Sequence, residues 1–198
     1  MSIHRIPSGK GQYLLMDSAL HAGKRRAYSV LKAHNQSVSL KNNQPYHNAK
    51  GENAMFTKIL YPTDFSDVAL KAFNYIKQLK AVGAEEVIIL HVIDQKDIDA
   101  LAMYTDKDFI KLEKNWEEAA HEQITPLVVE LEKLGFRVKI KIARDVPFRK
   151  ILKMEEEEGV SVIVIGSHGK SNIKEMLLGS VSEKVIRKAT TPVLVIKR

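Results

Sequence analysis

The sequence contains no cysteine, which excludes disulfides, thiolate metal sites and cysteine nucleophiles. It also lacks an apolar run of the ~20 residues that a membrane-spanning helix needs, and residues 1–12 have no signal-peptide core. We therefore expect a cytoplasmic protein with no membrane partner. With 44% hydrophobic and 28% charged residues among 198, the balance is that of a globular chain, which excludes disorder throughout.

Acidic residues are scarce in the first 54 positions. Eight Lys and Arg stand there against two acidic residues, whereas the rest of the chain holds 23 basic and 22 acidic residues. The formal net charge of +7 therefore describes this segment more than the nearly neutral body. A basic patch is the electrostatic footprint of nucleic-acid binding, so a nucleic-acid partner is expected, if at all, only through residues 1–54.

Residues 1–54 show no sustained apolar period. We expect a basic, disordered N-terminal extension, or sequence that lies upstream of a true start at Met55. Two alternatives stay open. One is a basic arm for nucleic acid or another polyanion, and the other is an organelle transit peptide, because the segment is poor in acid and contains Arg and Ser.

From Met55 onward, apolar segments with strand and helix periods alternate. This βαβαβαβαβ order predicts an α/β fold with a five-stranded parallel sheet and helices on both faces. The near-continuous apolar strands agree, because such a sheet is covered on both sides. The expected strands are 56–61, 87–92, 137–142, 160–165 and 193–196, and the expected helices are 66–82, 107–134, 147–158 and 180–189.

Local signals refine this outline. Ser66 can cap the first helix. Pro126 lies inside the long second helix and should kink it, or restart it with Thr125 as a new cap. Residues 137–142 alternate Val and Ile with Lys, which predicts a strand near a sheet edge. Glu155 to Glu158 are interpreted as a solvated helix face.

In open parallel sheets, ligands bind beyond the C-terminal ends of the strands. Two such ends carry polar residues. The first strand is followed by Pro62 to Ser66, and the fourth by Gly166 to Ser171. Gly179 to Ser182 then open the final helix.

The segment from Gly166 to Ser171 ends like a P-loop, but only two residues separate its glycines instead of four, so we reject that interpretation. The spacing that is present is Gly166, two residues, Gly169, nine residues, Gly179 and Ser180. Glycines let backbone N–H groups approach phosphate oxygens, and a helix N-terminus favours anions. Residues 170–178 would arch over a polyphosphate, and the hydroxyls of Ser180 and Ser182 would add donors.

These residues carry a resemblance to a known family. Residues 55–198 resemble the ATP-binding branch of the universal stress protein family, whose motif G-x2-G-x9-G-[S/T] follows the fourth strand. The segments after the first two strands (62–66 and 91–94) and the closing segment 191–196 are similar as well. The resemblance implies a sheet of order 3-2-1-4-5, with ATP between the first and fourth strands.

The resemblance also implies residue roles. Pro62, Thr63 and Asp64 would border the adenine and ribose, and the backbone of Val92 would bind the base. A divalent cation, Mg²⁺ or Mn²⁺, would accompany the triphosphate and take most of its ligands from phosphate and water. The ribose and phosphates would be held by Gly166, His168, Gly169, Gly179, Ser180, Val181 and Ser182.

Several of these residues have a plainer interpretation. Asp64 could merely cap the first helix. His168 fits a residue that lines the ligand better than an acid or base, because no carboxylate is visibly spaced to orient it. His91 lies in an apolar strand and is expected to be structural.

We therefore expect an ATP-binding regulatory protein that acts as a nucleotide-dependent switch in the stress response. The alternative is a slow ATPase, or a nucleotide-dependent phosphotransferase that uses His168 or Ser180. Val193 to Ile196 should lie at one edge of the sheet, where an apolar strand can pair with its copy. Related proteins commonly pair in this way, so a homodimer is expected.

Overall fold

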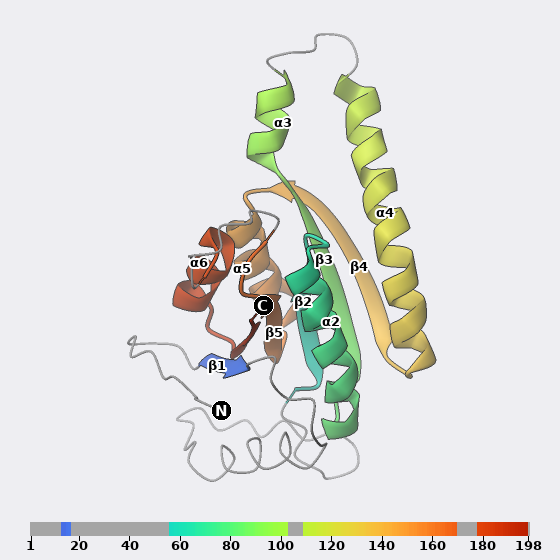
Figure 1. The fold of residues 1–198 in the computed structure, drawn as a ribbon, viewed down its shortest axis with the longest axis vertical. Coiled ribbons are helices and arrows are strands. Elements are labelled where there is room, and N and C mark those ends of the chain that lie inside the picture. The colour runs from blue at the N-terminus through green and yellow to red at the C-terminus, as the bar shows by residue number, and fades with distance from the viewer. Residues whose placement is uncertain (1–12, 17–55, 103–108, 170–177, 198) are drawn as a thin grey trace.

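A computed structural model describes residues 13–16, 56–102, 109–169 and 178–197. Its sheet has six strands, all parallel, in the order β1-β6-β5-β2-β3-β4 (Figure 1). The last five in chain order confirm the predicted order 3-2-1-4-5. They are β2 (Lys58–Pro62), β3 (Glu86–Asp94), β4 (Arg137–Asp145), β5 (Val162–Gly166) and β6 (Val193–Ile196).

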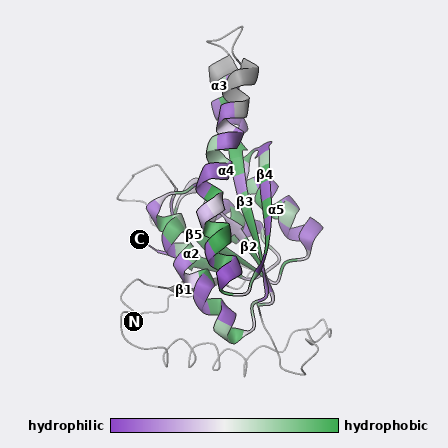
Figure 2. Ribbon diagram, turned by 90° about the vertical axis from the view of Figure 1, so that its right-hand side faces the viewer, coloured by the Kyte–Doolittle hydropathy of each residue, from purple (hydrophilic) through white to green (hydrophobic). Residues whose placement is uncertain are grey.

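Helices cover both faces of the sheet, as predicted. One core joins α2 and α4 to the sheet, and a second core joins α5 and α6 to its other face. The inner strands β2, β3 and β5 are strongly apolar between these layers (Figure 2), because a sheet covered on both sides offers few positions to polar side chains. The helices are α2 (Asp67–Leu79), α3 (Gln95–Ala102), α4 (Phe109–Lys133), α5 (Pro147–Glu158) and α6 (Ser180–Lys188), with the 3-10 turn η1 (Lys80–Val82) after α2.

One strand was not expected. β1 (Tyr13–Met16) pairs in parallel with β6, with Tyr13 in register with Val193 and Met16 with Ile196. β6 is therefore not the edge of this sheet, and the prediction of an unpaired final strand is wrong. Residues 13–16 also depart from the expectation of disorder before residue 55, while the rest of that segment lies outside the described residues.

The long helix α4 is continuous through Pro126. The prediction that Thr125 caps a restarted helix is wrong, because the Thr125 hydroxyl donates to the carbonyl of His121 at 2.8 Å, one turn back within the same helix. The helix α3 was not predicted; it follows β3 directly, and Figure 1 shows that it projects with the start of α4 beyond the sheet.

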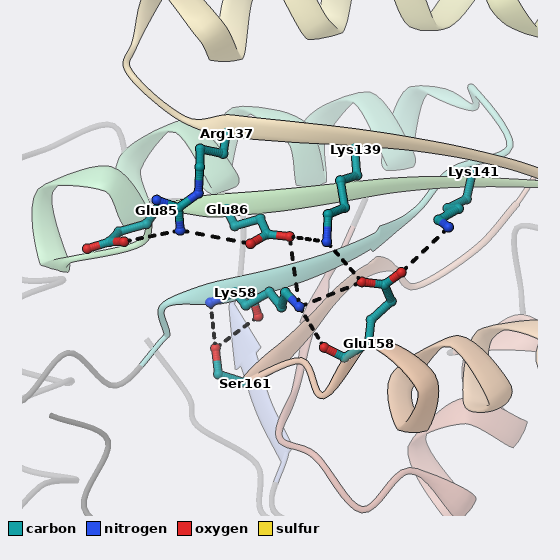
Figure 3. Close-up of polar contacts among 8 residues, drawn as sticks. All are labelled: Lys58, Glu85, Glu86, Arg137, Lys139, Lys141, Glu158 and Ser161. Atoms are coloured by element: carbon teal, nitrogen blue, oxygen red, sulfur yellow. Dashed lines mark hydrogen bonds and ion pairs between the residues drawn. The ribbon is translucent and has the colours of Figure 1, made fainter. Parts of the chain in front are cut away.

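The basic residues of β4 pair with glutamates of β3, α5 and the turn before β3 (Figure 3). β4 forms the edge of the sheet opposite β1. Lys139 Nζ lies 2.9 Å from Glu86 Oε1 and 3.2 Å from Glu158 Oε2. Lys58 Nζ donates to the Glu158 carbonyl at 2.7 Å. Hydrogen bonds from the Lys139 ammonium hold the pKa of Glu158 below its usual value of 4.5. The expectation that β4 is an edge strand is thus confirmed.

The four glutamates at the end of α5 do not form a solvated face. Glu155 is buried, and its Oε1 accepts from the Thr190 N–H at 2.8 Å, the Thr190 hydroxyl at 2.9 Å and the Thr191 N–H at 2.5 Å. A carboxylate that satisfies three donors fixes the turn between α6 and β6. Only Glu156 and Glu157 are exposed.

Candidate functional site

The loop after β2 is held by its own hydrogen bonds. The Thr63 N–H donates to the Leu90 carbonyl at 2.9 Å, and the Thr63 hydroxyl oxygen accepts from the Phe65 N–H at 3.1 Å. The buried Tyr61 hydroxyl donates to the Ala69 carbonyl at 2.7 Å and so ties β2 to α2. Burial raises the pKa of Tyr61 to about 12. The loop is thereby preorganised.

Phe65 has φ +62°, a left-handed conformation that bulky residues adopt only when surrounding structure imposes it. Its ring lies 4.6 Å from that of His91, centroid to centroid. His91 Nδ1 lies 2.9 Å from the Thr63 carbonyl oxygen. These contacts with Phe65 and Thr63 support the structural role expected for His91, because they hold the loop after β2 in its conformation.

Asp64 reaches from this loop toward the loop after β5. Its Oδ1 accepts from the Ser66 N–H at 3.1 Å. A Cβ built on Gly169 would lie 2.5 Å from Asp64 Oδ2, so a side chain at position 169 would displace the Asp64 carboxylate. The alternative that Asp64 caps α2 is wrong, because Ser66 is the cap and accepts from the Ala69 N–H.

Ser167 organises the second loop, although sequence reasoning missed it. The residue is fully buried. Its carbonyl accepts from the Gly179 N–H and from the Ser182 hydroxyl, both at 2.7 Å, and its N–H donates to the Ile196 carbonyl at 2.8 Å. Its hydroxyl lies 2.9 Å from His168 Nδ1. Ser167 thus joins the end of β5, the start of α6 and the end of β6.

The start of α6 has N–H groups that the helix itself does not bond. Gly179 is its cap and has no side-chain capping bond, and the first N–H bonded within the helix is that of Glu183, to the Gly179 carbonyl. The N–H groups of residues 180–182 are those that a helix start leaves without an intrahelical partner. A Cβ on Gly179 would lie 3.3 Å from His168 Cα, so glycine allows the loop and helix to meet closely.

The backbone of Val92 points into the same region. β2 ends at Pro62, in register with Leu90, whereas β3 continues to Asp94. Alternate residues of a parallel strand direct their N–H and C=O groups to the same side. Because the Leu90 carbonyl bonds Thr63 of the β2 loop, the polar groups of Val92 face the side where β2 has ended.

The predicted residues therefore come from the ends of four elements. Pro62 to Asp64 come from the end of β2, Val92 from β3, and the glycine and serine residues from the loops around β5 and α6. Two of the predicted residues have a structural role. Gly166 packs against α2, where a Cβ on it would lie 3.1 Å from the Val68 backbone. The buried Ser182 hydroxyl donates to the carbonyls of Ser167 and Gly179. Of the predicted arch, 170–178, residues 170–177 lie outside the described residues.

Within the described ranges, no group of three or more His, Asp and Glu side chains is placed to hold a metal ion. The helices of those ranges likewise include none with the length and apolar character to cross a bilayer.

Comparison with known proteins decides the family. The sequence profile described as the universal stress protein family matches residues 55–197. The chain belongs to the universal stress protein family. Universal stress protein MJ0577 of Methanocaldococcus jannaschii is 43% identical over 156 residues, which cover 73% of this chain and 96% of that protein. Universal stress protein YxiE of Bacillus subtilis is 33% identical and covers 72% and 100% of the two chains.

Solved structures of similar proteins agree with the fold of this universal stress protein. A structure of MJ0577, described as a hypothetical protein assigned a biochemical function from its structure, superposes with a TM-score of 0.67 at 46% identity. It covers 73% of this chain and 97% of its own. A structure of the hypothetical protein PH0823 gives a TM-score of 0.57 at 35% identity, with coverage of 73% and 97%.

Proposed function

We propose that this protein binds ATP at the loops around β2, β5 and α6, and acts as a cytoplasmic, nucleotide-dependent switch of the stress response. The observation that carries the proposal is the meeting of Asp64 with Gly169 beside the open N-terminus of α6. This juxtaposition sets a carboxylate and a series of backbone donors at one end of the sheet. A nucleotide has the matching chemistry, with hydroxyl donors on its ribose and anionic oxygens on its phosphates.

The phosphates fit the α6 side. The N–H groups of Ser180 and Val181 carry the positive end of the helix dipole, and Gly169 is exposed and has no side chain to obstruct them. Ser182 contributes its backbone N–H, while its hydroxyl positions Ser167. His168, half-buried and set beside Ser167, would line the ribose and phosphates.

The base and ribose fit the β2 side. A carboxylate close to phosphate would be repulsive, so Asp64 is better matched to ribose hydroxyls, with Pro62 and Thr63 beside it. The N–H and C=O of Val92 offer one donor and one acceptor, which suit the edge of a purine. This division of roles places the base by β3 and the polyphosphate by α6.

The cation would be Mg²⁺ or Mn²⁺ bound to the triphosphate. Mg²⁺ keeps several waters and needs few protein carboxylates, which suits a site where the described residues form no carboxylate cluster. Its contribution would be to neutralise phosphate charge. We assign no protein ligand to it.

We also propose a division of the chain and a mode of assembly. Residues 55–198 form the ATP-binding domain, and residues 1–54 are a basic extension that contributes β1. Two copies pair through Val193–Ile196 when that edge is free. The support is the apolar character of β6, all four of whose residues are buried.

The experiment that tests the nucleotide proposal starts with protein purified without added nucleotide. The protein is denatured, and the released small molecules are separated by anion-exchange chromatography and identified by mass spectrometry. We expect ATP or ADP from the unmodified chain and much less from Gly169→Val. A control is Glu156→Val, at an exposed position of α5. Release of a ligand other than an adenine nucleotide would contradict the proposal.

A further inference from the structure

The two edges of the five-stranded core differ sharply in chemistry. At one edge, β4 carries Arg137, Lys139 and Lys141, all exposed and engaged in ion pairs with glutamates (Figure 3). Charges of this kind are how proteins prevent an edge strand from pairing with another chain. At the other edge, β6 reads Val-Leu-Val-Ile and has no charge between Pro192 and Lys197.

The β6 edge is covered by the chain itself. β1 pairs with all four residues of β6, and the sequence of β1, Tyr-Leu-Leu-Met, is apolar throughout (Figure 1). The cover replaces the charges that protect β4. Without it, the unsatisfied N–H and C=O groups of β6 would face outward along an apolar strand.

This cover is attached weakly by comparison with the core. β1 has four residues and one neighbouring strand, whereas β3 pairs with nine residues of β4 and five of β2. About 40 residues separate Met16 from β2, so pairing closes a long loop and carries its entropy cost. The same length lets β1 leave without displacing β2.

We propose that β1 is a removable cover of the β6 edge, and that a second copy of this chain occupies the edge when β1 leaves. The two occupants are mutually exclusive because both need the same backbone groups of Val193 to Ile196. β1 pairs in parallel, whereas a two-fold partner would pair β6 with β6 in antiparallel fashion. The inference rests on the assembly part of the proposed function, not on its nucleotide part.

The test uses the full chain with Leu14→Pro and Leu15→Pro together. Consecutive prolines remove the ladder N–H whichever of the two faces β6. Sedimentation equilibrium of the unmodified chain and the variant should give a dimer dissociation constant at least ~10-fold lower for the variant. ATP affinity, measured on the same samples, should be the same in both, because β1 pairs with β6 and not with β2, β3 or β5, whose ends carry the proposed site. A failure of this inference is thus distinguishable from a failure of the nucleotide proposal.

Competition with a peptide tests whether the dimer forms at the β6 edge. A synthetic peptide of residues 11–18, added in excess, should return the variant to monomer, and the same peptide with both prolines should have no effect. A folded variant that shows no gain in dimer, or a dimer that the peptide leaves intact, overturns the proposal. Failure of the variant to fold also overturns it, because a removable cover is dispensable to the fold.

Discussion

Asp64 and Gly169 approach each other so closely that a Cβ on Gly169 would lie 2.5 Å from Asp64 Oδ2. They are separated by more than 100 residues in sequence and belong to loops that follow neighbouring strands, β2 and β5. The contact joins the expected ribose side of the site to the expected phosphate side. It also means that a change at either residue disturbs the other.

This contact predicts coupled effects on ATP binding. Gly169→Val should weaken binding at least ~30-fold, about 2 kcal/mol, because the branched side chain displaces both phosphate and Asp64. Asp64→Ala should weaken it as well. In Asp64→Ala/Gly169→Val the two losses should not add, since touching residues couple by about 0.5–3 kcal/mol. Calorimetric titration of the four proteins measures this, and strict additivity would show that the contact is not part of the site.

A second prediction concerns turnover. Phosphoryl transfer needs a positioned nucleophile and charge clamps on the γ-phosphate, and His168 lies beside Ser167, where we propose that it lines the ribose and phosphates. We expect ATP hydrolysis slower than about one per minute, far below the usual enzyme range. A steady-state rate of several per second that His168→Ala abolishes would contradict this expectation and support an ATPase.

Glu155 should matter for stability while its neighbour does not. Glu155→Ala strands two N–H groups and a hydroxyl that now share one carboxylate oxygen, and the expected loss in the free energy of unfolding is about 2–3 kcal/mol. Glu156→Ala, on the exposed side of α5, should change it by less than about 0.5 kcal/mol. Urea unfolding of both variants decides the matter, and equal losses would contradict the structural role of Glu155.

The charge cluster along β4 predicts a pH dependence. The pKa of Glu158 is lowered in the fold, chiefly by hydrogen bonds from Lys139, so its contribution to stability is present above pH 4.5 and is lost as pH falls through the lowered pKa. The difference in unfolding free energy between the unmodified chain and Glu158→Gln should therefore shrink on acidification. That difference should also shrink at high salt, because the paired lysines are partly exposed. If this difference in unfolding free energy grew as the pH fell, the result would contradict the proposed role of Glu158.

The sequence predicts the core of the fold because four strands of the body are nearly continuous apolar runs, β4 alternates apolar and basic residues, and segments with a helix period separate the strands. α5 and β6 were placed residue for residue. β1 was missed because four apolar residues in a basic, polar segment are too few to establish a period, and only the edge of β6 selects them as a strand. α3 was missed for a similar reason, since residues 95–102 are rich in polar side chains.

The candidate site was also predicted only in part. The glycine spacing predicts the loops because the residues that form each loop are close together in the sequence. Ser167 and the buried Glu155 were missed because their partners lie far along the chain: Glu155 bonds residues 35 and 36 positions away. A run of four glutamates resembles a solvated face until packing turns one of them inward. The left-handed Phe65 carries no signal in sequence either, as its conformation is imposed by the surrounding contacts.

The measurement that tests the central claim most directly is a calorimetric titration of the unmodified, nucleotide-stripped chain with ATP in the presence of Mg²⁺. We predict saturable binding of one ATP per chain that Gly169→Val weakens at least ~30-fold, while Glu156→Val, at an exposed position of α5, leaves the affinity unchanged. The absence of binding to the folded unmodified chain, or an unchanged affinity in a folded Gly169→Val protein, would contradict the assignment of this site.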